Sequence, residues 1–118
     1  MQAVLLVTGL PSPPADAAAL FHARWMPQAR AVFATLQGED CALLIVAPEA
    51  DHTHAEWRLA AARMLAREAA PVRVNIVGCD KAAEMQALTD YLAAAPGITG
   101  QYLPANIQLA STSGSGSL

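Results

Sequence analysis

The chain has 118 residues, of which 54% are hydrophobic and 14% charged, and its formal net charge is -3. A chain of this size and composition builds one domain, and its seven basic residues provide no basic stripe for a nucleic-acid partner. No apolar run reaches the roughly eighteen residues of a membrane span, and no basic segment precedes a signal-like core, so we expect a cytoplasmic protein without membrane contact.

The N-terminal part predicts two strands with a helical region between them. Segment 2–8 (QAVLLVT) is a first strand that ends at Gly9, and its continuous hydrophobicity favours a strand covered on both faces. Segment 17–36 has helical composition, and Pro27 is expected to kink this helix or to start a second one. Segment 41–47 (CALLIVA) is a second strand, again apolar throughout.

The middle of the chain predicts a helix followed by a strand. Thr53 and Glu56 have the T-x-x-E spacing of a capping box, so we expect the central helix to begin there. Alanine, leucine and arginine fill the following turns up to Pro71, which cannot continue a helix. Segment 72–77 (VRVNIV) is then a third strand, and a helix that feeds a buried strand is part of a β-α-β crossover.

The C-terminal part predicts one more helix and one more strand. Asp80 is a good N-cap for a helix over residues 81–94. A short last strand is expected within residues 101–109, where Pro104 indicates an edge position or an irregular path. Segment 111–118 (STSGSGSL) is expected to be a flexible tail.

The order of elements is therefore β-α-β-α-β-α-β within one domain, residues 1–110. Four strands that alternate with three helices predict the α/β class. We expect a three-layer α/β/α sandwich around an open, Rossmann-like parallel sheet of about four strands.

Short motifs in the second half of the chain resemble the short-chain dehydrogenase/reductase family. Residues 59–68, followed by the R-V-N of residues 73–75, are similar to the helix and strand after that family's active-site lysine. The I-T-G-Q of residues 98–101 is similar to the stretch before its last strand, and residues 41–47 occupy the place of its catalytic-serine strand. On this mapping residues 3–109 correspond to the C-terminal half of such an enzyme. The resemblance implies a Rossmann-type sheet.

In that family NAD(P) and a Ser-Tyr-Lys set reduce a carbonyl, and this chain lacks the corresponding residues. Its only tyrosines are Tyr91 and Tyr102 and its only lysine is Lys81, so no Y-x-x-x-K exists. Ser12, the only serine before the tail, lies on another segment, and Gly9 stands alone where a glycine-rich turn would hold a dinucleotide. The sequence therefore predicts a truncated pseudoenzyme with no catalytic residue, cofactor or metal.

The carboxyl ends of the predicted strands carry other candidate residues, because ligands bind at this end of an α/β sheet. His52, His54 and Glu56 form an H-x-H-x-E pattern that suits either a metal or a solvated loop. Cys41 and Cys79 adjoin predicted strands and are either buried hydrophobes or, in an electropositive setting, reactive thiols. An alternative function as a small-molecule-binding protein, or as an enzyme with unfamiliar chemistry, would use a pocket of Glu49, His52, His54, Cys79 and Asp80.

A partner surface is the other hypothesis. In the full-length family the strand equivalent to residues 4–8 is central, so a chain without the nucleotide-binding half would present a long apolar edge, which proteins normally cover. Alanine-rich helices that carry Trp, Met and Arg suit close packing between subunits. Alternatively, the Trp and Met side chains belong to the core and the Arg side chains to a solvated face. We expect a homodimer, or a heteromer with a full-length reductase of this family, such as a structural subunit of a ketoreductase. The candidate interface residues are Val4, Leu5, Leu6, Val7, Trp25, Trp57, Arg63, Met64 and Arg67.

Overall fold

The structure is a computed structural model that describes residues 1–38 and 40–105. The alternation of elements is the one that the sequence predicts. Residues 106–109 of the predicted last strand, and the predicted tail at residues 111–118, lie outside the described residues. The elements are β1 (Gln2–Leu6), α1 (Pro14–Leu20), a π-helical segment η1 (Phe21–Trp25), α2 (Met26–Phe33), β2 (Ala42–Ala47), a 3-10 turn η2 (His52–His54), α3 (Ala55–Ala69), β3 (Arg73–Gly78), α4 (Ala82–Ala93) and β4 (Tyr102–Pro104).

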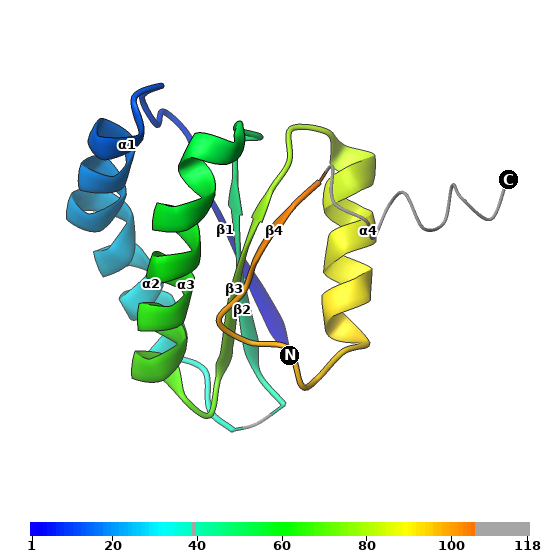
Figure 1. The fold of residues 1–118 in the computed structure, drawn as a ribbon. Coiled ribbons are helices and arrows are strands. Elements are labelled where there is room, and N and C mark those ends of the chain that lie inside the picture. Colours follow the sequence, from blue (N-terminus) through cyan, green and yellow to red (C-terminus); the bar gives the residue numbers. More distant parts are fainter. Residues whose placement is uncertain (39, 106–118) are drawn as a thin grey trace, which may run out of the picture.

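The four strands form one parallel sheet in the order β1-β2-β3-β4. Helices α1, α2 and α3 cover one face of this sheet and α4 lies on the other, as Figure 1 shows. The predicted three-layer α/β/α fold is therefore confirmed. Within the described part of the chain, none of the helices combines the length and the apolarity that crossing a membrane requires.

The strand register shows which side chains share a face. Val4 lies beside Leu44 and Leu6 beside Val46, so the side chains of all four project from the same face. Leu44 and Val46 pack with Leu88 and Leu92 of α4 in the smaller of two hydrophobic clusters. Val4 and Leu6 therefore lie on the same face of the sheet as α4, which contacts this face on β2, β3 and β4. The intervening side chains Ala3, Leu5 and Val7 contact the larger cluster beneath α1, α2 and α3.

The helical region between the first two strands changes its winding just before Pro27. The proline lies in the first turn of α2 and has no N–H to continue the α-helical bonding pattern. The preceding segment η1 is π-helical, and the N–H of Met26 donates to the carbonyl of Phe21, five residues back. The predicted interruption at Pro27 is confirmed, and this wider turn is how the chain accommodates it.

The predicted capping box is wrong. Helix α3 begins at Ala55 without a side-chain cap, and Thr53 lies in the preceding 3-10 turn. Asp51 Oδ1 accepts hydrogen bonds from both the backbone N–H (2.9 Å) and the hydroxyl of Thr53. These two bonds hold the pKa of the Asp51 carboxyl below its usual value. Thr53 lies one residue before His54, the N-cap of α3, so its hydroxyl is not at the position from which a capping box accepts.

Asp80 also does not cap its helix. The N-cap of α4 is Lys81, which makes no side-chain capping bond. Instead, Asp80 Oδ1 accepts a hydrogen bond from the backbone N–H of Glu49 at 2.9 Å. The carboxylate therefore joins the segment after β3 to the segment after β2, across the carboxyl end of the sheet.

Candidate functional site

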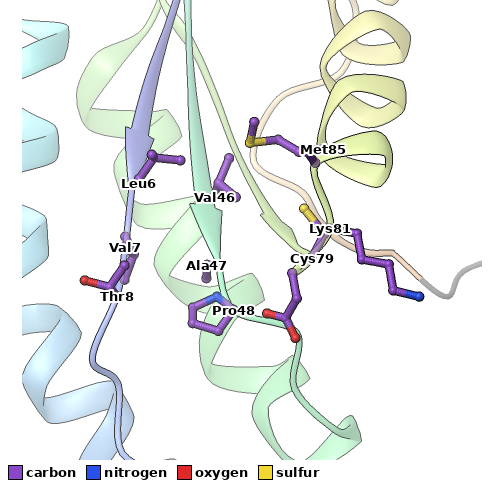
Figure 2. A pocket seen from close by; sticks show the side chains of 11 residues that line it. Leu6, Val7, Thr8, Val46, Ala47, Pro48, Cys79, Lys81 and Met85 are labelled. Carbon is purple, nitrogen blue, oxygen red and sulfur yellow. The ribbon is translucent and has the colours of Figure 1, made fainter.

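A groove with a volume of about 340 Å³ runs along the carboxyl ends of β1, β2 and β3. Figure 2 shows its walls: Leu6, Val7 and Thr8 on one side, Cys79, Lys81 and Met85 on the other, and the end of β2 between them. Most of these side chains are apolar, and charge enters only at Asp80 and Lys81. The groove lies where ligands bind in α/β sheets.

The groove continues into an exposed apolar face on β1. Val4 is 46% exposed and Leu6 is 57% exposed, and Met1 at the strand's start is also exposed. Leu6 also lines the groove, so the two surfaces meet at this residue. The prediction that β1 is covered on both faces is wrong. Its Leu5 side is covered, whereas its Val4 side extends beyond α4, as the side chains that α4 contacts lie on β2, β3 and β4.

The outer edge of β1 is also uncovered. Within the described residues β1 pairs only with β2, so its far side has no strand neighbour. A strand edge without a partner leaves backbone donors and acceptors free to pair with another chain. The open edge and the exposed side chains of Val4 and Leu6 together make a surface that we call the β1 surface.

The thiol in the groove is not an activated nucleophile. Cys79 is buried, and burial raises the pKa of its thiol, with smaller contributions from the nearby carboxylates of Glu84, Asp80 and Glu49. Nucleophilic cysteines need the opposite setting, one that stabilises the thiolate. Cys79 fits the interpretation as a buried hydrophobe.

A second cavity, of about 220 Å³, lies where the loop after β1 meets the start of α3. Its walls combine short apolar side chains with the hydroxyl of Ser12 and four ionisable groups. Pro48 lines both this cavity and the groove. The ionisable residues are Glu49, Asp51, His54 and Arg58.

His54 is held in one tautomer. The indole Nε1–H of Trp57 donates to His54 Nδ1 at 3.0 Å, and an indole can only donate. The imidazole proton therefore lies on Nε2, which donates to the carbonyl of Ser12 at 2.8 Å. With both nitrogens engaged, His54 has no free lone pair for a metal. His52 is exposed and lines neither cavity, and the described residues contain no cluster of three or more potential metal ligands.

Arg58 is the residue that our reading of the sequence missed. Its side chain is only 2% exposed, although it carries a full charge. Nη1 donates to the carbonyl of Pro48 at 2.8 Å and to the hydroxyl of Tyr102 at 3.2 Å. The guanidinium also lies 5.5 Å from the ring centres of both Trp57 and Tyr102.

The signal for this burial was the helical phase of Arg58. Ala61, Ala62 and Leu65 follow it by three, four and seven residues and form the buried stripe of α3. An arginine on that stripe must enter the core unless its helix shifts.

The structure separates the other predicted site residues into groups. Cys79 and Asp80 line the groove, and Glu49 and His54 line the second cavity. Among the candidate interface residues, Val4 and Leu6 are exposed, Leu5 is half-buried and Val7 is buried in the larger core cluster. Trp25 and Trp57 are partly buried against that cluster, whereas Arg63, Met64 and Arg67 are exposed on α3. Since α3 and the Val4 side of β1 lie on opposite faces of the sheet, one flat interface cannot contain both.

A comparison with protein families supports the relationship that the motifs indicate. The model of the family described as short-chain dehydrogenase-like protein matches residues 5–105, from β1 to the end of β4. No curated protein and no solved structure gives a significant match. The matched region contains the end of β1, the other three strands and all the helices described above. The chain therefore belongs to the short-chain dehydrogenase-like family.

Proposed function

We propose that this protein is a non-catalytic member of its family that works by association with a second chain through the β1 surface. The observation that carries the proposal is that Val4 and Leu6, two large apolar side chains, are about half exposed on a strand whose outer edge has no partner among the described residues. Exposed apolar groups that adjoin an open strand edge are typical of an interaction site.

The shape of the β1 surface indicates what the partner supplies. A strand beside β1 would satisfy the free edge, and a helix over Val4 and Leu6 would extend the layer that α4 begins. Another chain of the same family can offer both elements. The partner is accordingly a second copy of this chain or a full-length reductase. With a reductase as partner, the protein is a structural subunit of a ketoreductase.

The positions of the tyrosines and the lysine support a non-catalytic role. Tyr102 directs its hydroxyl at Arg58 among the residues beneath α3, whereas Lys81 borders the groove at the start of α4. Tyr91 is exposed on α4. These groups do not converge as a tyrosine general acid and its lysine must. The cytoplasmic location stays a prediction.

The experiment is light scattering on the purified chain at micromolar concentration, alone and mixed with the reductases that co-purify with it. We expect wild type to form a dimer or a defined complex with a reductase, and Leu6→Lys to abolish it. Met64→Lys is the control, because Met64 is 40% exposed on the opposite side of the sheet. A monodisperse wild-type monomer that associates with no reductase would refute the proposal.

The groove supports a second candidate function, the binding of a small molecule. Its volume of about 340 Å³ falls in the usual range for ligand sites, which begins near ~300 Å³. Fluorescence titration with NAD(P)H tests whether the small molecule is the cofactor of a reductase. Saturable binding would contradict the non-catalytic proposal, and absence of binding would support it.

A further inference from the structure

We infer that the cavity beside Arg58 binds a small zwitterion of the α-amino acid class, with its carboxylate on Arg58 and its ammonium group on Glu49 and Asp51. This inference goes beyond the proposed function, since the cavity is separate from the β1 surface. Four observations lead to it: a buried charge, a rigid setting for that charge, two acids in the same walls, and the cavity's size.

Among the described residues, no carboxylate forms an ion pair with Arg58. Both recorded partners of its Nη1 are neutral oxygens, and its Nε has no hydrogen-bond partner among the described residues. In the same part of the chain the only ion pair joins Arg30 to Glu68, elsewhere in the molecule. A guanidinium removed from water without an anion is strongly unfavourable. A bound carboxylate would supply the missing charge and two acceptor oxygens.

The guanidinium of Arg58 is held in place before any ligand arrives. It lies 5.5 Å from the ring centres of both Trp57 and Tyr102, and Nη1 donates to the Pro48 carbonyl. Gly78 leaves the room for this arrangement, because a Cβ there would lie 3.1 Å from Arg58 Nη1. A donor that is already oriented loses little conformational entropy on binding.

Glu49 and Asp51 restrict the kind of anion that fits. Both line the same cavity as Arg58. Hydrogen bonds from Thr53 hold the pKa of Asp51 below its usual value, so this side chain is ionised at neutral pH. A simple anion would be repelled by these carboxylates, whereas an ammonium group on the same ligand would be attracted to them. Only a ligand with both charges complements the whole cavity.

The cavity also limits the size of the ligand. Its volume of about 220 Å³ lies below the ~300–1,000 Å³ that drug-sized ligands occupy, which excludes a dinucleotide. Leu10 and Pro48 provide apolar wall for a short aliphatic side chain. L-Alanine is therefore a suitable probe.

The experiment is a titration of ¹⁵N-labelled protein at pH 7, followed by two-dimensional NMR, with L-alanine, acetate and methylammonium as separate probes. We expect saturable shifts at the backbone amides of Ala50, Asp51 and Arg58 with L-alanine. Acetate and methylammonium should each bind at least about tenfold more weakly, since each lacks one charge-assisted contact. No saturable shift with L-alanine, or shifts confined to the groove, would overturn the inference.

Variants separate the two ends of the ligand. Glu49→Gln alters an exposed side chain and should reduce the preference for L-alanine over acetate to about twofold, while Glu56→Gln, outside the cavity, should leave it unchanged. Arg58→Met should abolish binding of both probes. If Arg58→Met does not fold, Glu49→Gln decides: an unaltered preference for L-alanine refutes the inference. Light scattering on the same samples reports association separately.

Discussion

Nη1 of Arg58 donates a hydrogen bond to the hydroxyl of Tyr102 at 3.2 Å and so connects the first turns of α3 to β4. The residue beside this contact is Gly78, the last residue of β3. A Cβ at position 78 would lie 2.6 Å from the Tyr102 hydroxyl, closer than a Cβ atom approaches a non-bonded heavy atom. The contact between Arg58 and Tyr102 therefore requires glycine at this position.

Replacing Gly78 with alanine should displace Tyr102 and lower the free energy of unfolding by about 1–3 kcal/mol, the usual cost of overfilling a packed site. Urea denaturation measures this change. Gly97→Ala is the matched control, since a Cβ there meets no heavy atom within 4 Å. Equal stability of the two variants would show that Tyr102 moves aside at no cost.

Asn75→Ala should destabilise the protein by about 2–4 kcal/mol, because it leaves two backbone groups without partners. The buried Asn75 side chain donates to the carbonyl of Ile98 and accepts from the N–H of Gln101, each at 3.0 Å. Urea denaturation is again the measurement, with Gln101→Ala as control because that side chain is exposed. A loss below about 1 kcal/mol would mean that water replaces both bonds.

Cys79 should react with iodoacetamide at least about tenfold more slowly than an unhindered thiol at pH 8, because burial and nearby carboxylates raise its pKa. Mass spectrometry after timed labelling gives the rate, and Cys41→Ser leaves Cys79 as the only thiol. Glu84→Gln removes one of these carboxylates and should increase the rate. Labelling of Cys79 as fast as that of free cysteine would contradict the assignment of a buried thiol.

Glu68→Gln should cause a small loss of stability at neutral pH that disappears in acid. Arg30 binds Glu68 through Nε at 2.7 Å and Nη2 at 3.1 Å, and this pairing lowers the pKa of the Glu68 carboxyl. A lowered folded-state pKa stabilises the protein above the unfolded pKa, and this stabilisation is lost as pH falls through the folded value. The effect is small because the side chains are 46% and 38% exposed.

Thermal denaturation of wild type and Glu68→Gln between neutral and acidic pH gives this difference. Added salt should also reduce it, because the pair is exposed. A difference that stays constant across the pH range would show that the charge of Glu68 does not contribute.

The alternation of strands and helices was predictable because it is encoded locally. The continuous apolar run at residues 42–47 and the β-branched run at residues 72–77 favour strands, and the structure buries nearly all of both. The starts of helices were not predictable in the same way. Thr53 and Asp80 each have the right residue type for a cap, but Asp51 and the Glu49 amide compete for them.

The site was less predictable because its residues depend on distant neighbours. Arg58 is buried through Tyr102, 44 residues away, and no local pattern announces that contact. Similarly, segment 2–6 reads as a fully covered strand, since the exposure of Val4 and Leu6 depends on how far α4 reaches across the sheet. The polar residues at the carboxyl ends of the strands were predicted from their position in the sequence alone. Position does not show which of them line the groove and which line the second cavity.

The strand order β1-β2-β3-β4 has a consequence for biosynthesis. Each strand lies beside the one translated just before it, so the spatial order of the strands is their order in the sequence. Within residues 1–38 and 40–105, no later strand returns to the side of β1 that β2 leaves free. The edge at which we propose a partner therefore belongs to the first part of the sheet to be translated.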